Sequence, residues 1–180
     1  MQRKSLKSIV LILILLGSTA CISAQKTGPV IKDYGKVWKI DHLDFKTNKS
    51  NTFKALFDVS YSPEDKMKLN GSLETAARFL NMHVQDGVPL EQIKVALVVH
   101  GNSSKDLLNS KAYKAKYGVV NPNEKMLKDL MNVGVDIVFC GQTFSSLGYL
   151  RNDLIPGVQI SLSAMTALIQ FQEDEYRTVF

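Results

Sequence analysis

The chain has 180 residues, of which 45% are hydrophobic and 22% are charged, and its formal net charge is +5. This length suits one domain with a sizeable core. Three basic residues, Arg3, Lys4 and Lys7, lie in a predicted export signal, and without them 19 basic residues face 17 acidic ones, a net charge near +2. A nucleic-acid-binding surface needs a basic patch, so this class of function is excluded.

The first 24 residues have the order of regions found in a secretory signal peptide. Basic residues precede an apolar run at residues 9–16, and small residues follow. The run is too short to span a bilayer, which takes about 20 residues. Ser23-Ala24-Gln25 predicts cleavage after Ala24; alternatively, Cys21 becomes a lipid-modified N-terminus. We therefore expect an exported, periplasmic protein, attached to a membrane only if Cys21 is lipidated.

The segment that follows the signal, residues 25–50, is polar and is predicted to form an N-terminal arm or hairpin. Val30-Ile31 and residues 37–40 are its candidate strands. Trp38 is expected to cover an apolar surface, on this chain or on a second subunit. Residues 51–180 contain no internal repeats, low-complexity tracts or linkers, so they are predicted to form one domain.

Strand and helix patterns alternate along this domain. Short apolar runs rich in β-branched and aromatic residues predict strands at residues 52–59, 93–99, 135–139 and 158–160. Apolar residues at helical spacing predict helices between and after these strands. Nearly continuous apolar strands that alternate with helices indicate a three-layer α/β/α sandwich with a mainly parallel sheet of about four to five strands.

Polar and small residues predict where the helices begin. The predicted helix starts are Ser72, Ser103 or Ser104, Pro122 at a first-turn position, Thr143 and Ser163. The helix after Thr143 is expected to be short, because Gly148 follows closely.

The carboxyl ends of parallel strands meet at one edge of a sheet, where ligands of open α/β sheets bind. The sequence places four polar segments at this edge: Ser60-Tyr61, His100-Gly101-Asn102, Cys140-Gly141-Gln142 and Ser161-Leu162-Ser163. Gly101 and Asn102 begin a segment suited to hold a small anion at a helix start.

Cys140 lies where a strand meets the first turn of a helix, and the free N–H groups of such a turn favour a thiolate. After cleavage at Ala24 it would be the single cysteine of the mature chain. An unpaired cysteine in an exported protein is either a buried small hydrophobe or a reactive thiol, and both interpretations stay open. His100 would raise the thiolate fraction if it paired with Cys140; alternatively, its ring bonds to backbone.

Other chemistries lack their residues. One cysteine and three scattered histidines do not provide the three or four ligands of a metal site. The sequence has no G-x-S-x-G elbow, no Walker sequence and no G-x-G-x-x-G fingerprint, so no cofactor is expected.

Four segments in order resemble the exported branch of the DsrE/DsrF-like proteins: Val98-Val99-His100-Gly101, Asn121-Pro122-Asn123, residues 134–142 and residues 163–168. The resemblance covers about residues 53–170, with an upstream piece at residues 28–35. It implies a flavodoxin-like fold, assembly into trimers or hexamers, and a sulfur relay in which Cys140 carries a persulfide from a donor protein to an acceptor protein.

Two functions remain open. In the first, a sulfurtransferase-like carrier, Cys140 attacks a sulfane sulfur, the Gly141 and Gln142 amides stabilise the anion, and His100 assists. The second is a non-catalytic oligomeric module that binds a small ligand, with Cys140 in a packing role. The ligand-binding residues expected at the rim are Gly101, Asn102, Gly141, Gln142 and Ser163.

Overall fold

The computed structural model describes residues 24–179, which form a five-stranded, all-parallel sheet with the order β4-β3-β2-β1-β5. The strands are β1 (Phe53–Val59), β2 (Ile93–Val99), β3 (Asp136–Cys140), β4 (Gln159–Ser161) and β5 (Arg177–Thr178). The predicted α/β class and parallel sheet are confirmed. The predicted export signal as far as residue 23, including Cys21, lies outside the described residues.

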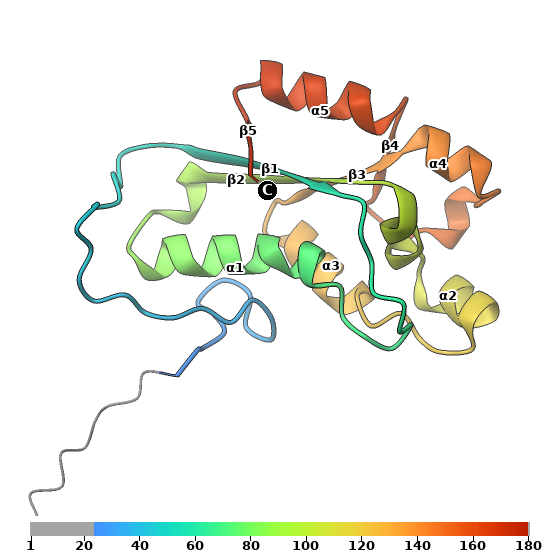
Figure 1. Cartoon of the computed structure of the whole chain (residues 1–180), viewed down its shortest axis with the longest axis horizontal. Helices are drawn as coiled ribbons and strands as arrows, with labels where there is room; N and C mark the ends of the chain where they lie inside the picture. Colours follow the sequence, from blue (N-terminus) through green and yellow to red (C-terminus); the bar gives the residue numbers. More distant parts are fainter. Residues whose placement is uncertain (1–23, 180) are drawn as a thin grey trace, which may run out of the picture.

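Helices cover both faces of the sheet (Figure 1). Helices α1 (Gly71–Gln85) and α3 (Glu124–Asn132) lie on one face, and α5 (Ala164–Glu173) lies on the other. Two shorter helices, α2 (Ser110–Tyr117) and α4 (Gly141–Ser146), lie toward the carboxyl ends of the strands. The connections contain the 3₁₀ helices η1 (Leu90–Gln92), η2 (Gly101–Leu107) and η3 (Arg151–Asp153). Within residues 24–179, no helix has the length and apolar character needed to cross a membrane.

The centre of the core is β2, which lies between β1 and β3. Its residues 96–99 are fully buried, because helices pack on both faces of the sheet. The register aligns Val59 of β1 with Val99 of β2, and Val99 with Phe139 of β3. The next residues along, His100 and Cys140, therefore lie at the same level at the carboxyl edge of the sheet.

Helix α1 begins at Gly71, next to the predicted start, but the predicted cap Ser72 is wrong, and no α-helix begins at Ser103 or Ser104. Asn70, rather than Ser72, caps α1: its Oδ1 accepts a hydrogen bond of 2.9 Å from the Ser72 N–H. Ser103 lies inside η2, where its Oγ donates to the carbonyls of Val59 and His100, so it joins two strand ends instead of capping a helix. Ser104 also lies inside η2, and α2 begins separately after Asn109.

Three other predicted helix starts concern α3, α4 and α5. Pro122 precedes the N-cap of α3, which is Asn123. Thr143 lies within α4, whose N-cap is Cys140, and α4 ends at Ser146, before Gly148. Ser163 caps α5 as predicted, and its Oγ accepts a hydrogen bond of 3.0 Å from the Thr166 N–H.

The N-terminal arm, residues 25–50, runs beside α1 and precedes β1 (Figure 1). The predicted paired strands are absent from this segment, which contains one antiparallel bridge, between Lys26 and Val37. The fully buried Asn81 of α1 holds the arm: its Oδ1 accepts from the Ile31 N–H at 2.8 Å, and its Nδ2 donates to the Gly35 carbonyl at 3.0 Å. Backbone groups of the arm are thus satisfied by a helix side chain instead of a strand partner.

Candidate functional site

Cys140 is both the last residue of β3 and the N-cap of α4. It pairs in register with Ser161 of β4, and 6% of its surface is exposed. The turn that follows is tight: a Cβ added to Gly141 would overlap the carbonyl oxygen of Ser161. Glycine at this position therefore lets the start of α4 approach the end of β4 closely.

The thiol of Cys140 lies among hydrogen-bond donors from two helices. Burial, the largest single effect, raises the pKa of the thiol, because it disfavours the charged form. Hydrogen bonds from the backbone and side chain of Thr143 and from the backbone of Ala164 and Gln142 outweigh this effect, so the pKa of Cys140 is lowered. The first turns of α4 and α5 together therefore stabilise a thiolate.

His100 follows β2 directly, and its ring contacts a carboxylate at the neighbouring strand end. Its Nε2 lies 2.9 Å from Oδ1 of Asp58 in β1. The two side chains are 32% and 42% exposed. The groups that lower the pKa of Cys140 are donors of α4 and α5, and His100 is not among them.

The predicted ligand-binding residues fall into two groups. The backbone of Gln142 is one of the groups that lower the pKa of the Cys140 thiol, while its side-chain Nε2 donates to the Leu162 carbonyl at 3.1 Å. Ser163 is buried at the start of α5 and caps that helix, next to the Ala164 N–H. Gly101 and Asn102 instead line a separate pocket of about 320 Å³, and Cys140 is not among its lining residues.

Sequence reasoning missed several residues of both groups. Thr143 was expected to act as a helix cap, not as a donor to the thiol, and the backbone of Ala164 was not expected there. The pocket at Gly101 is also lined by three lysines that were not predicted: Lys66, Lys105 and Lys116.

Lys105 is buried in the wall of this pocket by a polar network. Its Nζ lies 2.6 Å from Oδ1 of the fully buried Asp106 and 2.5 Å from Oγ of Ser62. Ser62 in turn donates to Oδ2 of Asp106 at 2.7 Å, and Asn70 donates to the same oxygen at 2.8 Å. Nothing in the local sequence indicates that the adjacent charged residues Lys105 and Asp106 are buried. In residues 24–179, no cluster of histidine, cysteine, aspartate or glutamate is arranged to hold a metal ion.

The fold and this site define a flavodoxin-like α/β protein with one thiol at the carboxyl edge of a parallel sheet. The chain belongs to the DsrE/DsrF-like family, whose sequence model matches residues 54–180. No curated protein matches it.

Two solved structures are similar to the chain. A protein of unknown function, MTH1491 from Methanobacterium thermoautotrophicum, is 15% identical, with a TM-score of 0.52; the match covers 71% of this chain and 97% of that one. The ychN protein from E. coli is 20% identical, with a TM-score of 0.49 and the same coverage of the two chains. At these identities the likeness concerns the fold, and the likeness to MTH1491 supports the α/β assignment.

Proposed function

We propose that this DsrE/DsrF-like protein is an exported sulfur carrier in which Cys140 holds sulfane sulfur as a persulfide. The observation that carries the proposal is the hydrogen bonding of the Cys140 thiol by α4 and α5, which lowers its pKa. The thiolate is the nucleophilic form of cysteine, and a lowered pKa increases its fraction near neutral pH. Membership of the family supports a role of the sulfur-relay kind.

The chemistry needs no oxidant or reductant beyond the donor and the acceptor. The Cys140 thiolate attacks the terminal sulfur of a donor persulfide, the S–S bond of the donor breaks, and the donor leaves as a thiolate. The new S–S bond joins Cys140 to the transferred sulfur. The negative charge on this terminal sulfur then accepts hydrogen bonds from Thr143 and Ala164. A thiolate of the acceptor protein then attacks this terminal sulfur and restores the Cys140 thiolate.

His100 has a smaller part in the proposal than the sequence predicts. A protonated ring would favour the thiolate, but Asp58 hydrogen-bonds the ring and its carboxylate offsets a positive charge. We therefore assign the main stabilisation of the anion to the N–H groups and to the Thr143 hydroxyl. A long-range contribution from His100 stays a prediction.

Intact mass spectrometry of protein isolated from its native envelope tests the proposal. We expect a fraction of the protein to be heavier by one sulfur atom, about 32 Da, and to lose this mass on reduction. Cys140→Ser should abolish the adduct. If Cys140 reacts slowly with iodoacetamide even at about pH 8, close to the pKa of a free thiol, the carrier proposal is wrong. The same spectrum gives the mature N-terminus and so tests cleavage after Ala24 against lipidation at Cys21.

A non-catalytic binding module is the second candidate, and one observation favours it. The pocket at Gly101 and Asn102 is lined by Lys66, Lys105 and Lys116, a residue type that a site for a small anion would use, while Cys140 is not part of it. Under this alternative, Cys140→Ser leaves anion binding and assembly intact. Loss of binding in a folded Cys140→Ser variant would count against it.

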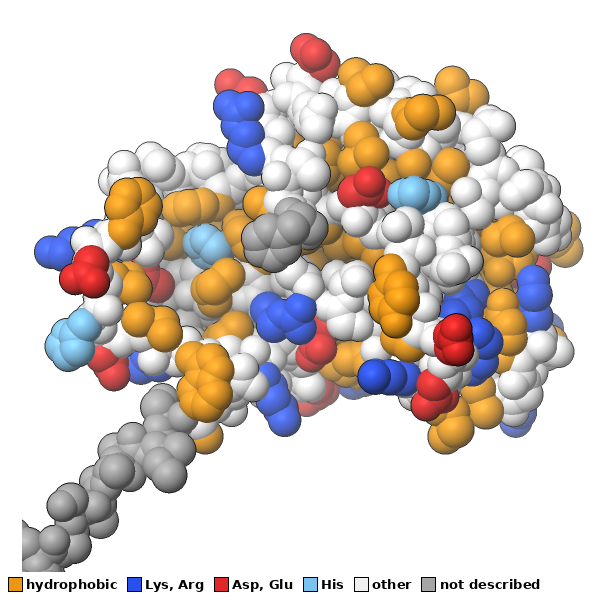
Figure 2. Space-filling view, viewed as in Figure 1, with side chains coloured by type: hydrophobic (Ala, Val, Ile, Leu, Met, Phe, Trp, Pro, Cys, Tyr) orange, Lys and Arg blue, Asp and Glu red, His pale blue; other side chains and the backbone are white. Residues whose placement is uncertain are grey.

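We also propose that the protein forms a homo-oligomer, a trimer or hexamer, through the outer side of α5. Met165 and Ile169 of α5, one helical turn apart, are 72% and 59% exposed, and Leu162, just before the helix, is 72% exposed. Apolar side chains are visible over this helix in Figure 2. Sedimentation should give a trimer or hexamer mass, and Met165→Glu should shift it toward the monomer. Gln170→Glu, which adds the same charge to the exposed surface of α5, is the control. A monomeric wild type would contradict the proposal.

A further inference from the structure

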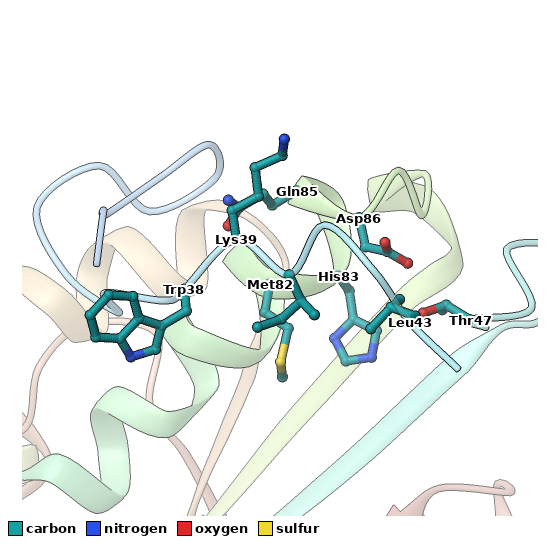
Figure 3. Close-up of a pocket in the computed structure, with 9 residues that line it drawn as sticks. Trp38, Lys39, Leu43, Thr47, Met82, His83, Gln85 and Asp86 are labelled. Atoms are coloured by element: carbon teal, nitrogen blue, oxygen red, sulfur yellow. The ribbon is translucent and has the colours of Figure 1, made fainter. Parts of the chain in front are cut away.

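A second pocket lies far along the chain from the thiol, where the N-terminal arm passes over the last turns of α1. Its volume is about 270 Å³. Trp38, Ile40 and Leu43 of the arm and Met82 of α1 form its apolar wall, and all four are at least 36% exposed. In Figure 3, Trp38 lies at one end and Asp86 at the other, with Met82 and His83 between them. Apolar side chains are also exposed on this part of the surface in Figure 2.

Asp86 is a carboxylate without a partner. Among the described residues its side chain forms no hydrogen bond and no ion pair, and its Oδ2 is sealed from solvent. It is also the C-cap of α1, the helix end that carries partial negative charge, so its position is electrostatically unfavourable. A positive charge placed beside Asp86 would relieve both costs.

His83 adds an acceptor at the same end of the pocket. Its Nδ1 lies 2.8 Å from the Phe79 carbonyl, which can only accept, so Nδ1 carries the hydrogen and Nε2 of the neutral ring accepts. The ring packs against Phe79 and Phe53 in tilted arrangements, with centroid distances of 4.0 and 4.8 Å, which restricts its orientation. This end of the pocket therefore presents two hydrogen-bond acceptors, the Asp86 carboxylate and Nε2 of His83, and suits a ligand with a hydrogen-bond donor.

The lysines close to the pocket do not neutralise Asp86. Lys39 lines the pocket, but its Nζ forms an ion pair of 2.6 Å with Asp41. The Nζ of Lys49 lies beside Gly87, the residue after Asp86, but it forms no ion pair with the Asp86 carboxylate. Among the described residues, Asp86 is thus the carboxylate of this site without an ion-pair partner.

We propose that this pocket binds a small organic cation: a primary ammonium group carried on a short apolar body. An ammonium has three donors and no acceptor, which matches Asp86 and Nε2 of His83. The apolar body would cover Met82 and reach the indole of Trp38, whose face also attracts cations. The proposal is independent of Cys140 and of the sulfur-carrier function.

Trp38 is the only tryptophan of the chain, so its fluorescence reports directly on this pocket. The purified protein is titrated with n-hexylamine, with 1-hexanol as the neutral analogue and with hexanoate as the anionic one. We expect a saturable change with hexylamine, at concentrations about tenfold or more below those needed for the other two, because a hydrogen bond to a charged group adds about that factor.

Asp86→Asn keeps the shape of the side chain and removes its charge, and we expect it to abolish the preference for the amine. Glu91→Gln, an exposed carboxylate outside the pocket, should leave the preference unchanged. Far-UV circular dichroism establishes that both variants fold, and the three-probe comparison on the wild type tests the proposal without any variant. Equal affinity for hexylamine and hexanol, no saturable response, or an unchanged preference in folded Asp86→Asn would each overturn it.

Discussion

The imidazole Nε2 of His100 lies 2.9 Å from Oδ1 of Asp58, a contact between the ends of two neighbouring strands, β2 and β1. Cys140 ends the strand on the other side of β2. The histidine is therefore hydrogen bonded by a carboxylate at the same rim that holds the thiol. This carboxylate weakens the electrostatic effect of a protonated ring on Cys140, whereas the backbone and side chain of Thr143 are among the groups that lower the pKa of the thiol.

The first prediction compares these two influences through the iodoacetamide reactivity of Cys140. Thr143→Val removes the hydroxyl donor at nearly constant shape, and we expect the rate near neutral pH to fall roughly tenfold, because hydrogen bonds to charged groups contribute about 1.5–3 kcal/mol. His100→Ala should change the rate by no more than about twofold, as expected of a partly exposed charge. Thr75→Val in α1 controls for the substitution itself. If His100→Ala slows the reaction as much as Thr143→Val, the histidine acts directly on the thiol.

The second prediction concerns the dependence of stability on pH. The pKa of Cys140 is lowered in the folded protein, and it returns to about 8.5 on unfolding. Between these two values the unfolded chain binds more protons, so the thiol contributes stability that is complete above about pH 8.5 and is lost as pH falls through the folded pKa.

Urea unfolding of wild type and Cys140→Ser measures this contribution. Serine does not titrate in this range, and the other groups cancel in the comparison. The free energy of unfolding of wild type relative to Cys140→Ser should increase from about pH 6 to about pH 9. A constant difference, or one that decreases with pH, would show that the folded protein does not favour the thiolate.

The elements that the sequence predicts best are those set by local patterns. The strand predicted at residues 93–99 is β2, residue for residue, because a continuous apolar run between turns has few alternatives. Ser163 caps α5 because serine before a helical pattern satisfies the first N–H groups on its own. Ser103 has the same signal, but it lies inside the 3₁₀ helix η2, and its hydroxyl donates to the carbonyl of Val59, 44 residues earlier, instead of capping an α-helix.

The candidate site also has features that follow from the local sequence and features that do not. That Cys140 ends a strand and meets a helix start follows from neighbouring residues. The amides of Gly141 and Gln142 are expected at the sulfur for the same reason, and the backbone of Gln142 is among the groups that lower the pKa of the thiol. The amide of Ala164 comes from a different helix, and it reaches the thiol because β3 and β4 are paired as Cys140 with Ser161. Such convergence depends on strand order, which the local sequence does not contain.

The third prediction tests the buried network beside the pocket at Gly101. Asp106→Asn leaves the ammonium of Lys105 buried without a counter-ion, and we expect a loss of about 3–5 kcal/mol in the free energy of unfolding. The matched control is Asp129→Asn, which breaks an exposed pair with Lys125 and should cost about 1 kcal/mol or less. Both values come from urea denaturation at neutral pH. Equal losses in the two variants would show that the Lys105 pair is hydrated in solution.

The last prediction concerns how the arm is held on α1. Asn81→Ala removes the acceptor for the Ile31 N–H and the donor for the Gly35 carbonyl, so buried backbone groups of the arm lose their partners. We expect unfolding to become easier by about 2–4 kcal/mol, since each orphaned buried group costs about 1–3 kcal/mol and water would reach some of them.

Trypsin cleavage after the lysines of residues 24–50 should become faster in this variant before the domain itself is cut. The emission of Trp38 should shift to longer wavelength, because release of the arm takes the indole away from the wall formed with Met82. Asn132→Ala, at an exposed position at the end of α3, is the control and should stay within about 0.5 kcal/mol of wild type. The lysines of the arm are exposed in the folded protein, but trypsin cuts only where the backbone around them is released. A destabilised Asn81→Ala variant whose arm resists trypsin would therefore mean that other contacts hold the arm while the sheet stays folded.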